Sequence, residues 1–412
     1  MRSVLVVLLA AFAAALLGAS TAPGAPSPQA PSAILFQPDT GDVVYRRADT
    51  ERRQIASTTK LMTALVTREH ADLDDTFRAV AYPANPVESL MGLRAGERMS
   101  VRDLLEGLLL ASGNDAAATL AVRVGGSRRE FVRMMNRRAR ELGLRDTRFA
   151  NPIGLDDPRN HSTAADLVKL ALVVLRDPFL ARTVDRESAV VGTGDRRRTV
   201  VNRNTLVRTV GWVDGVKTGH TSQAGYVLVG AAKRRGVRVV SAVLGDPSEA
   251  ARDADTLELL RWGLARYRLA TPVRRGEALA EPRLAYRDET VELVAARRVR
   301  TVLRRGEDAE VRVVGAPAEI DGALRAGERV GAVVVSRRGK EVARVPLVAS
   351  EAVAAASLGD RVSSALPSAW LSSALLGLLV VVGCSLHLAL RRRRRTRRRQ
   401  ARARRRGGTE AA

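Results

Sequence analysis

Hydrophobic and polar positions alternate with two different periods over the first two thirds of the chain. Apolar residues spaced three and four apart predict helices over Lys60–Glu69, Val101–Leu110, Ala116–Val124, Arg129–Leu142, Ala164–Leu175 and Ala254–Tyr267. Short apolar and β-branched runs predict strands over Ala33–Phe36, Val43–Tyr45, Gly225–Ala232 and Val237–Leu244. Strands at both ends with helices between them predict one sheet, assembled from both ends of an α/β (α+β) domain at residues 33–270.

The helical period disappears after Thr271-Pro272. Turn signals such as Arg338-Gly339-Lys340 then separate short β-branched runs, which are Val291–Val294, Val299–Leu303, Glu310–Val314, Val330–Val335 and Glu341–Val348. This pattern predicts a small all-β domain over residues 272–350, in which the last two runs form a hairpin. The Ala- and Ser-rich residues 351–369 are expected to be a linker.

The C-terminal part of the sequence has the pattern of a membrane anchor. Residues 370–390 contain no charged side chain, and these 21 residues are enough to cross a hydrocarbon core of about 30 Å as a helix. An arginine cluster follows at once, in residues 391–412. Because positive charge next to a membrane segment stays in the cytoplasm, we expect a single-pass protein of the cell membrane with a cytoplasmic C-terminus.

The N-terminal sequence predicts export of everything before that anchor. A positive residue, an apolar run and then small residues predict a secretory signal peptide over residues 1–25. The Pro- and Ser-rich residues 26–32 are predicted to be an extended leader. The single cysteine, Cys384, lies inside the predicted transmembrane helix, so the exported part contains no disulfide.

The formal net charge of +24, with 63 arginines, raises the possibility of a nucleic-acid-binding protein. The last 22 residues, however, hold 12 of these arginines and one acid, and therefore carry almost half of the net charge. Export, together with only 14 aromatic residues available for base stacking, leads us to expect no nucleic-acid partner. The four histidines show no HExxH or paired spacing, so we also expect no metal ion and no cofactor.

Only five lysines stand beside the 63 arginines, and two of the five lie in short motifs. Lysine can lose its proton when buried, whereas arginine stays charged. In Ala56-Ser57-Thr58-Thr59-Lys60, a helix beginning at Ser57 would place the hydroxyl and the amine one turn apart, where the amine could take the hydroxyl proton. The alternative is that Ser57 is an N-cap and Lys60 a solvated side chain.

Two further motifs contain polar side chains around a glycine. In Ser112-Gly113-Asn114 a tight turn could direct a hydroxyl and an amide into one cleft; the alternative is a helix C-cap at Gly113. In Lys217-Thr218-Gly219-His220 the ammonium and hydroxyl could bind a carboxylate, while Gly219 lets a substrate backbone lie beside the strand; the alternative is an edge-strand lysine with a β-turn. Chance explains one such motif, but not all three in one chain.

With these three motifs the chain resembles the serine D-alanyl-D-alanine carboxypeptidases, the low-molecular-weight penicillin-binding proteins. The resemblance runs from about Pro31 to Val353 and includes ASTTKLMTAL, LLLASGNDAA, DTRFANPIGL, HSTAADL, VDGVKTGHT and SAVLG in the family's order. It implies a catalytic domain similar to serine β-lactamases and transpeptidases. The region ending in GERVGAVVV and VARVPLVAS is similar to the family's second domain.

The resemblance also implies a role for each motif residue. It makes Ser57 the nucleophile, Lys60 its base, Ser112 and Asn114 a proton-relay and amide-binding pair, and Lys217 and Thr218 the ligands of the substrate carboxylate. It places the oxyanion hole at the backbone N–H groups of Ser57 and His220. Arg203 and Arg252 match positions where the family carries arginines that help to hold the carboxylate end.

The implied reaction removes the terminal D-alanine from peptidoglycan stem pentapeptides through an acyl-enzyme on Ser57, and β-lactam antibiotics would bind covalently at the same serine. Lys60 must be neutral to accept the proton, and burial and the charge of Lys217 would both lower its pKa. A D,D-endopeptidase that cuts peptide cross-links would use the same residues. We favour the carboxypeptidase because of the additional β domain.

Two other classes fit the sequence less well. A class A β-lactamase resembles this pattern, but its deacylating glutamate normally lies in an ExxLN motif, which is missing from this sequence. A non-catalytic wall-binding module would not need the intact Ser57–Lys60 pair. Because the ExxLN glutamate is missing, we expect the acyl-enzyme formed with β-lactams to be long-lived.

Overall fold

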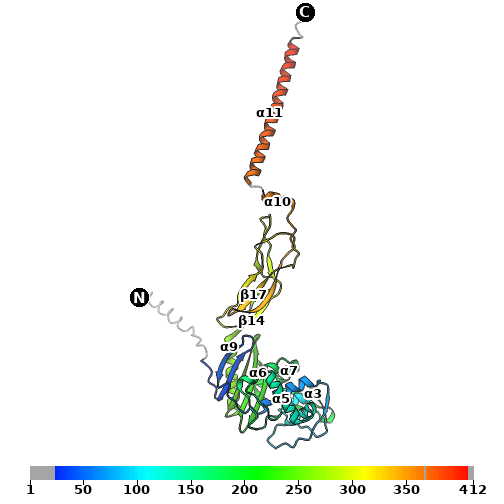
Figure 1. The fold of residues 1–412 in the computed structure, drawn as a ribbon, viewed down its shortest axis with the longest axis vertical. Helices are drawn as coiled ribbons and strands as arrows, with labels where there is room; N and C mark the ends of the chain where they lie inside the picture. The colour runs from blue at the N-terminus through cyan, green and yellow to red at the C-terminus, as the bar shows by residue number, and fades with distance from the viewer. Residues whose placement is uncertain (1–23, 366–367, 407–412) are drawn as a thin grey trace, which may run out of the picture. The chain divides into compact units, whose positions relative to one another are not determined.

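The computed structural model of the protein describes residues 24–365 and 368–406, which fall into two compact units (Figure 1). The first unit consists of the described residues up to Ala270 together with Thr301–Asp308. The second unit consists of Thr271–Arg300 and the described residues from Ala309 onward. Most of the predicted signal peptide, residues 1–23, lies outside the described residues.

The first unit contains a five-stranded antiparallel sheet with strand order β2-β1-β9-β8-β7. Its strands are β1 (Ser32–Gln37), β2 (Asp42–Arg47), β7 (Val213–Thr221), β8 (Gly225–Arg234) and β9 (Val237–Asp246). Strand β1 pairs with β9, so the beginning of the domain lies beside its late strands. The prediction of one sheet assembled from both ends of the domain is thereby confirmed.

Helices cover both faces of this sheet. The helices of the first unit are η1 (Ala56–Thr59), α2 (Lys60–His70), α3 (Val101–Leu109), α4 (Asn114–Gly125), α5 (Arg128–Glu141), α6 (Ala164–Val174), α7 (Pro178–Val184), η2 (Gly194–Arg196), α8 (Thr205–Thr209) and α9 (Glu249–Arg266). Alternate residues of β8 point to opposite faces. Val227 and Val229 join the core formed with α2 to α6, whereas Leu228 joins a smaller core formed with α9.

Capping side chains set several of the helix starts. Helix α3 begins after Ser100, whose Oγ accepts a hydrogen bond from the Asp103 N–H at 3.1 Å. Helix α9 begins at Glu249, five residues before the predicted start at Ala254, because Ser248 caps it by accepting from the Ala251 N–H. Short strand pairs outside the main sheet complete the unit, and they are β3 (Thr76–Arg78) with β4 (Arg98–Ser100) and β5 (Ser188–Val191) with β6 (Arg198–Val201).

The predicted leader at residues 26–32 is part of the first unit. Pro26, Pro28 and Ala30 are buried, and the Ala30 N–H donates to Asp255 Oδ2 at 2.8 Å. Ser32 is already the first residue of β1. The segment predicted to be an extended leader therefore packs against α9 as part of the first unit.

The two units divide between Ala270 and Thr271, close to the predicted boundary, but one later segment belongs to a different unit than expected. Strand β10 (Tyr267–Val273) runs through the predicted boundary and pairs with β14 (Val299–Arg304), a strand that was expected to belong wholly to the second domain. Arg305 N–H donates to the Arg266 carbonyl at 2.7 Å, and Val302 packs with buried Tyr267. The chain thus returns to the first unit between residues 301 and 308.

The second unit is built on a five-stranded sheet with strand order β11-β13-β18-β17-β15. Its strands, with the remaining short pair, are β11 (Ala278–Ala280), β12 (Arg283–Leu284), β13 (Leu293–Ala295), β15 (Glu310–Val314), β16 (Glu319–Ile320), β17 (Arg329–Arg337) and β18 (Lys340–Ala349). Strands β17 and β18 form the predicted hairpin, and Arg337 pairs with Lys340 at its end. Val333, Val335 and Leu347 are fully buried in this unit's own core.

Two helices follow the second sheet. Helix α10 (Leu358–Ala365) lies inside the segment predicted to be a linker. Helix α11 (Ser368–Arg406) starts close to the predicted transmembrane segment, 370–390, and continues without a break into the arginine cluster. Its residues Ser373–Arg398 are long and apolar enough to cross a membrane, and none of them is buried.

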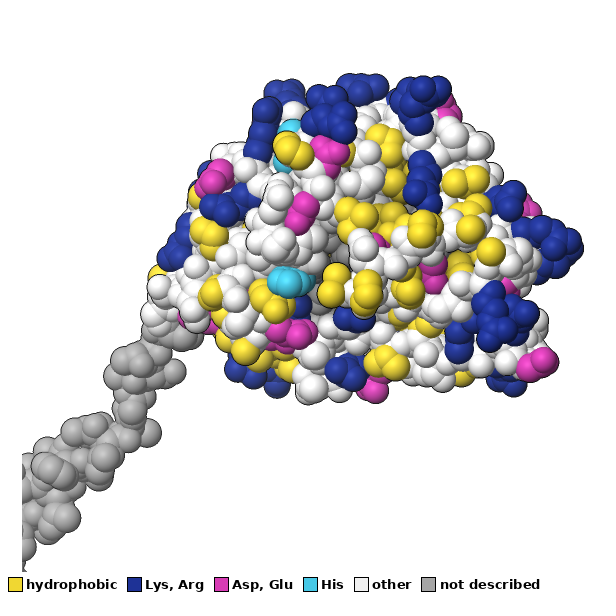
Figure 2. Space-filling model, turned by 90° about the horizontal axis from the view of Figure 1, so that it is seen from below, with side chains coloured by type: hydrophobic (Ala, Val, Ile, Leu, Met, Phe, Trp, Pro, Cys, Tyr) yellow, Lys and Arg dark blue, Asp and Glu magenta, His cyan; other side chains and the backbone are white. Residues whose placement is uncertain are grey.

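The space-filling view shows how basic side chains are distributed over one face of the molecule. Lys and Arg lie around the periphery of this face, and hydrophobic side chains gather between them (Figure 2). Acidic side chains lie next to many of the basic ones. On this face the arginines therefore do not form the continuous basic stripe that is typical of nucleic-acid-binding proteins.

Candidate active site

The first motif lies at the junction between a 3₁₀ turn and a helix. Ser57 is in η1 and Lys60 is the first residue of α2, so the predicted helix start at Ser57 is a tighter turn than expected. Neither helix uses Ser57 as its N-cap, because those positions are Ile55 and Thr59. Ser57 Oγ instead lies 2.8 Å from Lys60 Nζ, so the N-cap alternative is wrong.

Lys60 is fully buried in this arrangement. Its Nζ lies 2.8 Å from Ser57 Oγ and 2.7 Å from the Ile153 carbonyl oxygen, and both contacts are available to a neutral amine. Burial and then the charge of Lys217 lower the pKa of Lys60 well below its ordinary value, while Glu88 acts in the opposite direction. A neutral amine that donates to Ile153 keeps its lone pair for the Ser57 hydroxyl, as a general base requires.

A loop around Gly154 supplies the carbonyl group that holds Lys60. Asn151 Oδ1 accepts hydrogen bonds from the N–H groups of Ile153 and Gly154, at 3.1 and 2.6 Å, and so folds the turn. The Pro152 carbonyl accepts from Thr63 Oγ1 at 2.6 Å, which joins the loop to α2. Gly154 has a φ of +96°, and a Cβ there would lie 2.0 Å from the Ala56 carbonyl oxygen. Only glycine fits this position.

The second motif connects α3 to α4. Ser112 adopts a φ of +60°, whereas Gly113 has a φ of −59° and precedes Asn114, the first residue of α4. The alternative of a glycine C-cap at Gly113 is therefore wrong. Gly113 is required for space, because a Cβ would lie 2.9 Å from Asp115 Oδ1 and 3.1 Å from the Met91 nitrogen. Ser112 is 3% and Asn114 4% exposed.

The sequence motifs did not identify the residues that surround Asn114. Its Nδ2 donates to Glu88 Oε2 at 2.6 Å, and Tyr82 donates its hydroxyl to the same carboxylate oxygen. Asp115 accepts from three successive N–H groups, those of Met91, Gly92 and Leu93, at 3.0, 2.9 and 2.8 Å. The loop between β3 and β4 is thus fixed against the start of α4. No local pattern signals a contact that spans 26 residues.

The third motif lies on β7, an edge strand of the sheet, as its alternative interpretation required. Lys217 is nevertheless only 1% exposed, and β7 continues through Thr221 without a turn. Lys217 Nζ donates to the Thr218 carbonyl at 3.0 Å. Burial, followed by the charges of Arg203 and Arg252, lowers the pKa of Lys217 to about 7. The ammonium therefore lacks a carboxylate partner in the described structure, although it is buried.

Gly219 brings β7 next to the nucleophile. A Cβ at this position would lie 3.0 Å from each of the Ala56 Cβ, the Ile55 carbonyl oxygen and the Ser57 nitrogen. The lysine motif and the serine motif, which are 160 residues apart in sequence, thus meet backbone to backbone. The adjacent His220 is exposed, and its ring stacks on Tyr226 with centroids 4.0 Å apart.

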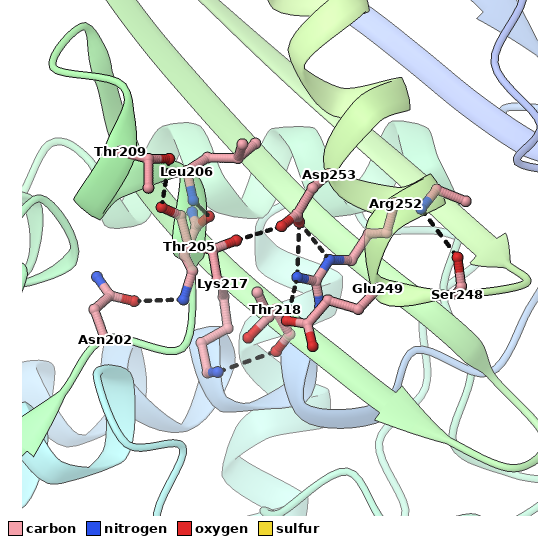
Figure 3. Close-up of polar contacts among 12 residues, drawn as sticks. Asn202, Thr205, Leu206, Thr209, Lys217, Thr218, Ser248, Glu249, Arg252 and Asp253 are labelled. Carbon is pink, nitrogen blue, oxygen red and sulfur yellow. Dashed lines mark hydrogen bonds and ion pairs between the residues drawn. The ribbon is translucent and has the colours of Figure 1, made fainter.

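The two predicted arginines occupy different environments near Lys217, and both lower its pKa. Arg252 is 3% exposed and forms ion pairs with Glu249 at 2.9 Å and with Asp253 at 2.7 Å (Figure 3). Asp253 also accepts a hydrogen bond from the Thr205 hydroxyl. Arg203 is exposed, and its Nε donates to the Ala111 carbonyl at 3.2 Å. Arg252 is therefore already neutralised locally, whereas Arg203 has only a carbonyl partner for its Nε.

Within residues 24–365 and 368–406, no group of three His, Cys, Asp or Glu side chains is placed to hold a metal ion. The chemistry available to the site is that of a hydroxyl, two lysines of lowered pKa, an amide and two arginines. That set can perform acyl transfer through a serine.

Comparison with known proteins identifies the family. The family description "D-alanyl-D-alanine carboxypeptidase" matches residues 19–248, more than half of the chain. The chain belongs to this family. The description "Penicillin-binding protein 5, C-terminal domain" matches residues 267–355. As a family member, the protein is a serine-type D-alanyl-D-alanine carboxypeptidase, a hydrolase of the penicillin-binding class, as the sequence analysis expected.

Curated relatives extend this similarity over both units. D-alanyl-D-alanine carboxypeptidase DacF of Bacillus subtilis is 31% identical over 332 residues, covering 78% of this chain and 85% of the relative. D-alanyl-D-alanine carboxypeptidase DacD of Escherichia coli is 35% identical over 360 residues, covering 83% of this chain and 91% of the relative. The similarity thus includes the β-rich unit as well as the three motifs.

Solved structures agree with this assignment. Penicillin-binding protein 5 from Haemophilus influenzae has a TM-score of 0.59 and 30% identity, covering 80% of this carboxypeptidase and 99% of that chain. The Streptomyces K15 DD-transpeptidase has a TM-score of 0.56 and 32% identity, covering 58% of this chain and 98% of that chain. The predicted fold class, a catalytic α/β domain with a second β domain, is confirmed.

Proposed function

We propose that the protein removes the terminal D-alanine from peptidoglycan stem pentapeptides through an acyl-enzyme on Ser57. The observation that carries this assignment is the 2.8 Å contact between Ser57 Oγ and the Nζ of fully buried Lys60. Ser57 itself is half-buried, so a substrate carbonyl can reach its hydroxyl. A neutral lysine in contact with an accessible serine forms an activated nucleophile.

Acylation follows from this geometry. The Ser57 hydroxyl proton passes to Lys60, and Oγ attacks the carbonyl carbon between the last two D-alanines. The Ser57 and His220 N–H groups are proposed to receive the developing negative charge on the carbonyl oxygen. The C–N bond then breaks and the leaving amine takes a proton, for which buried Ser112 is the proposed relay. Free D-alanine departs, and water hydrolyses the ester in a second step.

The charge of Lys217 orients the substrate for this attack. No carboxylate among the described residues pairs with its buried ammonium, and together with Thr218 it is proposed to bind the terminal carboxylate of D-alanine. Binding an anion would raise the pKa of Lys217 from about 7 and hold it protonated. Arg203 would add a second positive charge at the carboxylate end, whereas Arg252, paired with Glu249 and Asp253, is proposed to act from a distance.

A β-lactam reacts at the same serine, because its strained amide carbonyl takes the place of the peptide carbonyl and its carboxylate that of the D-alanine carboxylate. The sequence contains no ExxLN glutamate to activate water against the resulting ester. The penicilloyl-enzyme is therefore proposed to be long-lived, and the protein to be a penicillin target.

The proposed location follows from the two ends of the chain. Helix α11 is proposed to anchor the protein in the cell membrane, with the arginine-rich residues 391–412 in the cytoplasm and both units outside, facing the cell wall. Protease added to intact cells should then digest the two units and leave the tail protected. Digestion of the tail before membrane rupture would contradict this orientation.

The reaction is tested by offering the full chain, in detergent, two substrates side by side. One is a pentapeptide ending in D-Ala-D-Ala, and the other is a cross-linked peptide dimer. Release of free D-alanine from the first, with the dimer left intact, is expected. Preferential conversion of the dimer to monomers would make the protein a D,D-endopeptidase, and no cleavage of either would support a non-catalytic wall-binding module.

A further inference from the structure

Glu88 lies in the loop between β3 and β4, outside the three motifs, yet it contacts one of them directly. Two sets of hydrogen bonds hold the loop against α4. Three loop N–H groups donate to the Asp115 carboxylate, and the Asn114 N–H donates to the Ser89 carbonyl at 2.8 Å. Asp115 is only 3% exposed, so these bonds are shielded from water. The Glu88 carboxylate is therefore placed beside Asn114 by a segment that is hydrogen-bonded to the start of α4.

Four hydrogen bonds converge on this carboxylate. Oε2 accepts from Asn114 Nδ2 at 2.6 Å and from the Tyr82 hydroxyl, and Oε1 accepts from the Asn85 N–H at 3.2 Å and the Asn85 Nδ2 at 3.3 Å. Partial burial raises the pKa of Glu88, but the hydrogen bonds from Tyr82, Asn114 and Asn85 lower it, and the pKa lies below its ordinary value. Glu88 is thus an ionised acceptor at neutral pH.

An ionised carboxylate can only accept hydrogen bonds, and this determines how the Asn114 side chain is oriented. An asparagine amide has an NH₂ group on one side and a carbonyl oxygen on the other, and a flip exchanges the two. Only the orientation with Nδ2 toward Glu88 makes a bond, because the opposite one would place two oxygens in contact. The carbonyl Oδ1 then points away from Glu88 and is proposed to receive the substrate amide.

We propose that Glu88 is a positioning residue for the carboxypeptidase reaction, whose carboxylate fixes the Asn114 amide in the single orientation that receives the substrate peptide. This inference rests on the proposed role of Asn114 in binding the substrate amide. This role explains why the Glu88 carboxylate lies near the positively charged Lys217 and Arg203. Only a group that accepts hydrogen bonds and donates none can select one orientation of the Asn114 amide.

Glu88 also acts on the general base through its charge. Lys60 lies in the field of Lys217 and Arg203, which favour its neutral form, and of Glu88 and Asp115, which favour its protonated form. Replacing Glu88 by a neutral residue lowers the pKa of Lys60 further. Because activity needs neutral Lys60, the acid limb of the profile of kcat/KM against pH should then move to lower pH.

The test compares Glu88→Gln and Glu88→Ala with Glu141→Gln in the full chain. Glutamine keeps the size of Glu88 but can present either an oxygen or an NH₂ group, so the Asn114 orientation is no longer unique. Glu141 is exposed at the end of α5 and provides the same loss of charge far from the three motifs. The measurements are D-alanine release from the pentapeptide across pH, penicillin acylation and thermal unfolding.

We expect Glu88→Gln to lower kcat/KM by about 10-fold and Glu88→Ala by about 100-fold, as for lost hydrogen bonds to a charged group. The acid limb should shift to lower pH in both variants, and Glu141→Gln should behave as wild type. In an Asn114→Ala background, Glu88→Gln should add little further loss, because the group that Glu88 orients is already missing.

Three results would overturn the inference. They are wild-type kinetics in Glu88→Gln, a loss of activity without any shift of the acid limb, and full additivity with Asn114→Ala. The last two would assign Glu88 to loop packing alone. If wild-type protein itself releases no D-alanine in these assays, the proposed function fails instead, and that outcome is separate because it is measured before any variant.

Discussion

Substituting Gly219 by alanine tests whether the close approach of β7 to the nucleophile matters for catalysis. Gly219 does not have a positive φ, so alanine is compatible with its backbone conformation and only space is in question. The new Cβ would lie 3.0 Å from Ala56 Cβ, the Ile55 carbonyl oxygen and the Ser57 nitrogen. Ordinary van der Waals contact begins at about 3.4 Å. Either β7 or the turn at residues 55–57 must therefore move by a few tenths of an ångström.

That displacement falls on the groups that are proposed to form the oxyanion hole. A misplacement of about 1 Å can cost about 100-fold in rate, so a shift of roughly half that size is expected to lower the acylation rate by about 10-fold or more. Overpacking of this kind also costs about 1–3 kcal/mol in the free energy of unfolding. The assay is the second-order rate of labelling by a fluorescent penicillin, corrected for the folded fraction.

Gly230→Ala is the matched control. Gly230 lies on β8, also without a positive φ, and a Cβ there would lie 2.6 Å from Thr256 Cγ2 and 3.0 Å from Ser241 Oγ, on the side that faces α9. This variant should lose comparable stability but keep the wild-type rate of acylation. Equal acylation rates in Gly219→Ala and Gly230→Ala would refute the reasoning, because steric crowding at Ser57 would then have no catalytic consequence.

Three further predictions concern the titrating groups. Lys60→Arg conserves charge but removes the base, so penicillin acylation should fall by at least about 100-fold, and normal labelling would contradict the role of Lys60. Lys217 should give the profile of kcat/KM against pH an alkaline limb near pH 7, because the free enzyme loses the Lys217 proton as pH rises through that pKa. In the profile of kcat the limb should lie at higher pH, because the bound substrate carboxylate holds the proton on Lys217. An alkaline limb at the same pH in both profiles would contradict this role of Lys217. Burial and then Asp255 raise the pKa of Asp246 to about 8, so its protonated form adds stability that is lost as pH rises from about 4 to 8. Asp246→Asn should therefore gain stability relative to wild type over that range, by up to about 1.4 kcal/mol per pH unit, and a difference independent of pH in thermal unfolding would contradict this.

The sequence predicted those parts of the site that depend on short spacing. Ser57 and Lys60 are one turn apart, and Ser112 and Asn114 flank one glycine, so local geometry is enough to place each pair. The lysine motif was found because lysine is rare in an arginine-rich chain. The meeting of Gly219 with Ser57 could be expected from the family resemblance, but not from any local pattern.

Contacts formed over long distances in sequence were not predictable. Glu88 lies in a loop with no regular period, and its contact with Asn114 depends on how Asp115 captures that loop. The left-handed conformation of Ser112 was also missed, because a neighbouring glycine is the usual choice for a positive φ.

Two features of the domain organisation were missed for a related reason. Composition changes near residue 271, but the chain returns to the first unit at Thr301–Asp308, and the Pro-rich residues before β1 pack against α9. Local composition predicts neither the return of the chain nor the packing of the Pro-rich residues, because both depend on contacts that form only in the folded protein.

The most direct test of the account is to locate the acyl group by mass spectrometry. The full chain is incubated with penicillin, digested, and its peptides are mapped. The account predicts a stable adduct with the mass of intact penicillin on Ser57 alone, and none in Ser57→Ala. An adduct on another residue, such as Ser112, or undiminished labelling of Ser57→Ala, would contradict the assignment of Ser57 as the nucleophile.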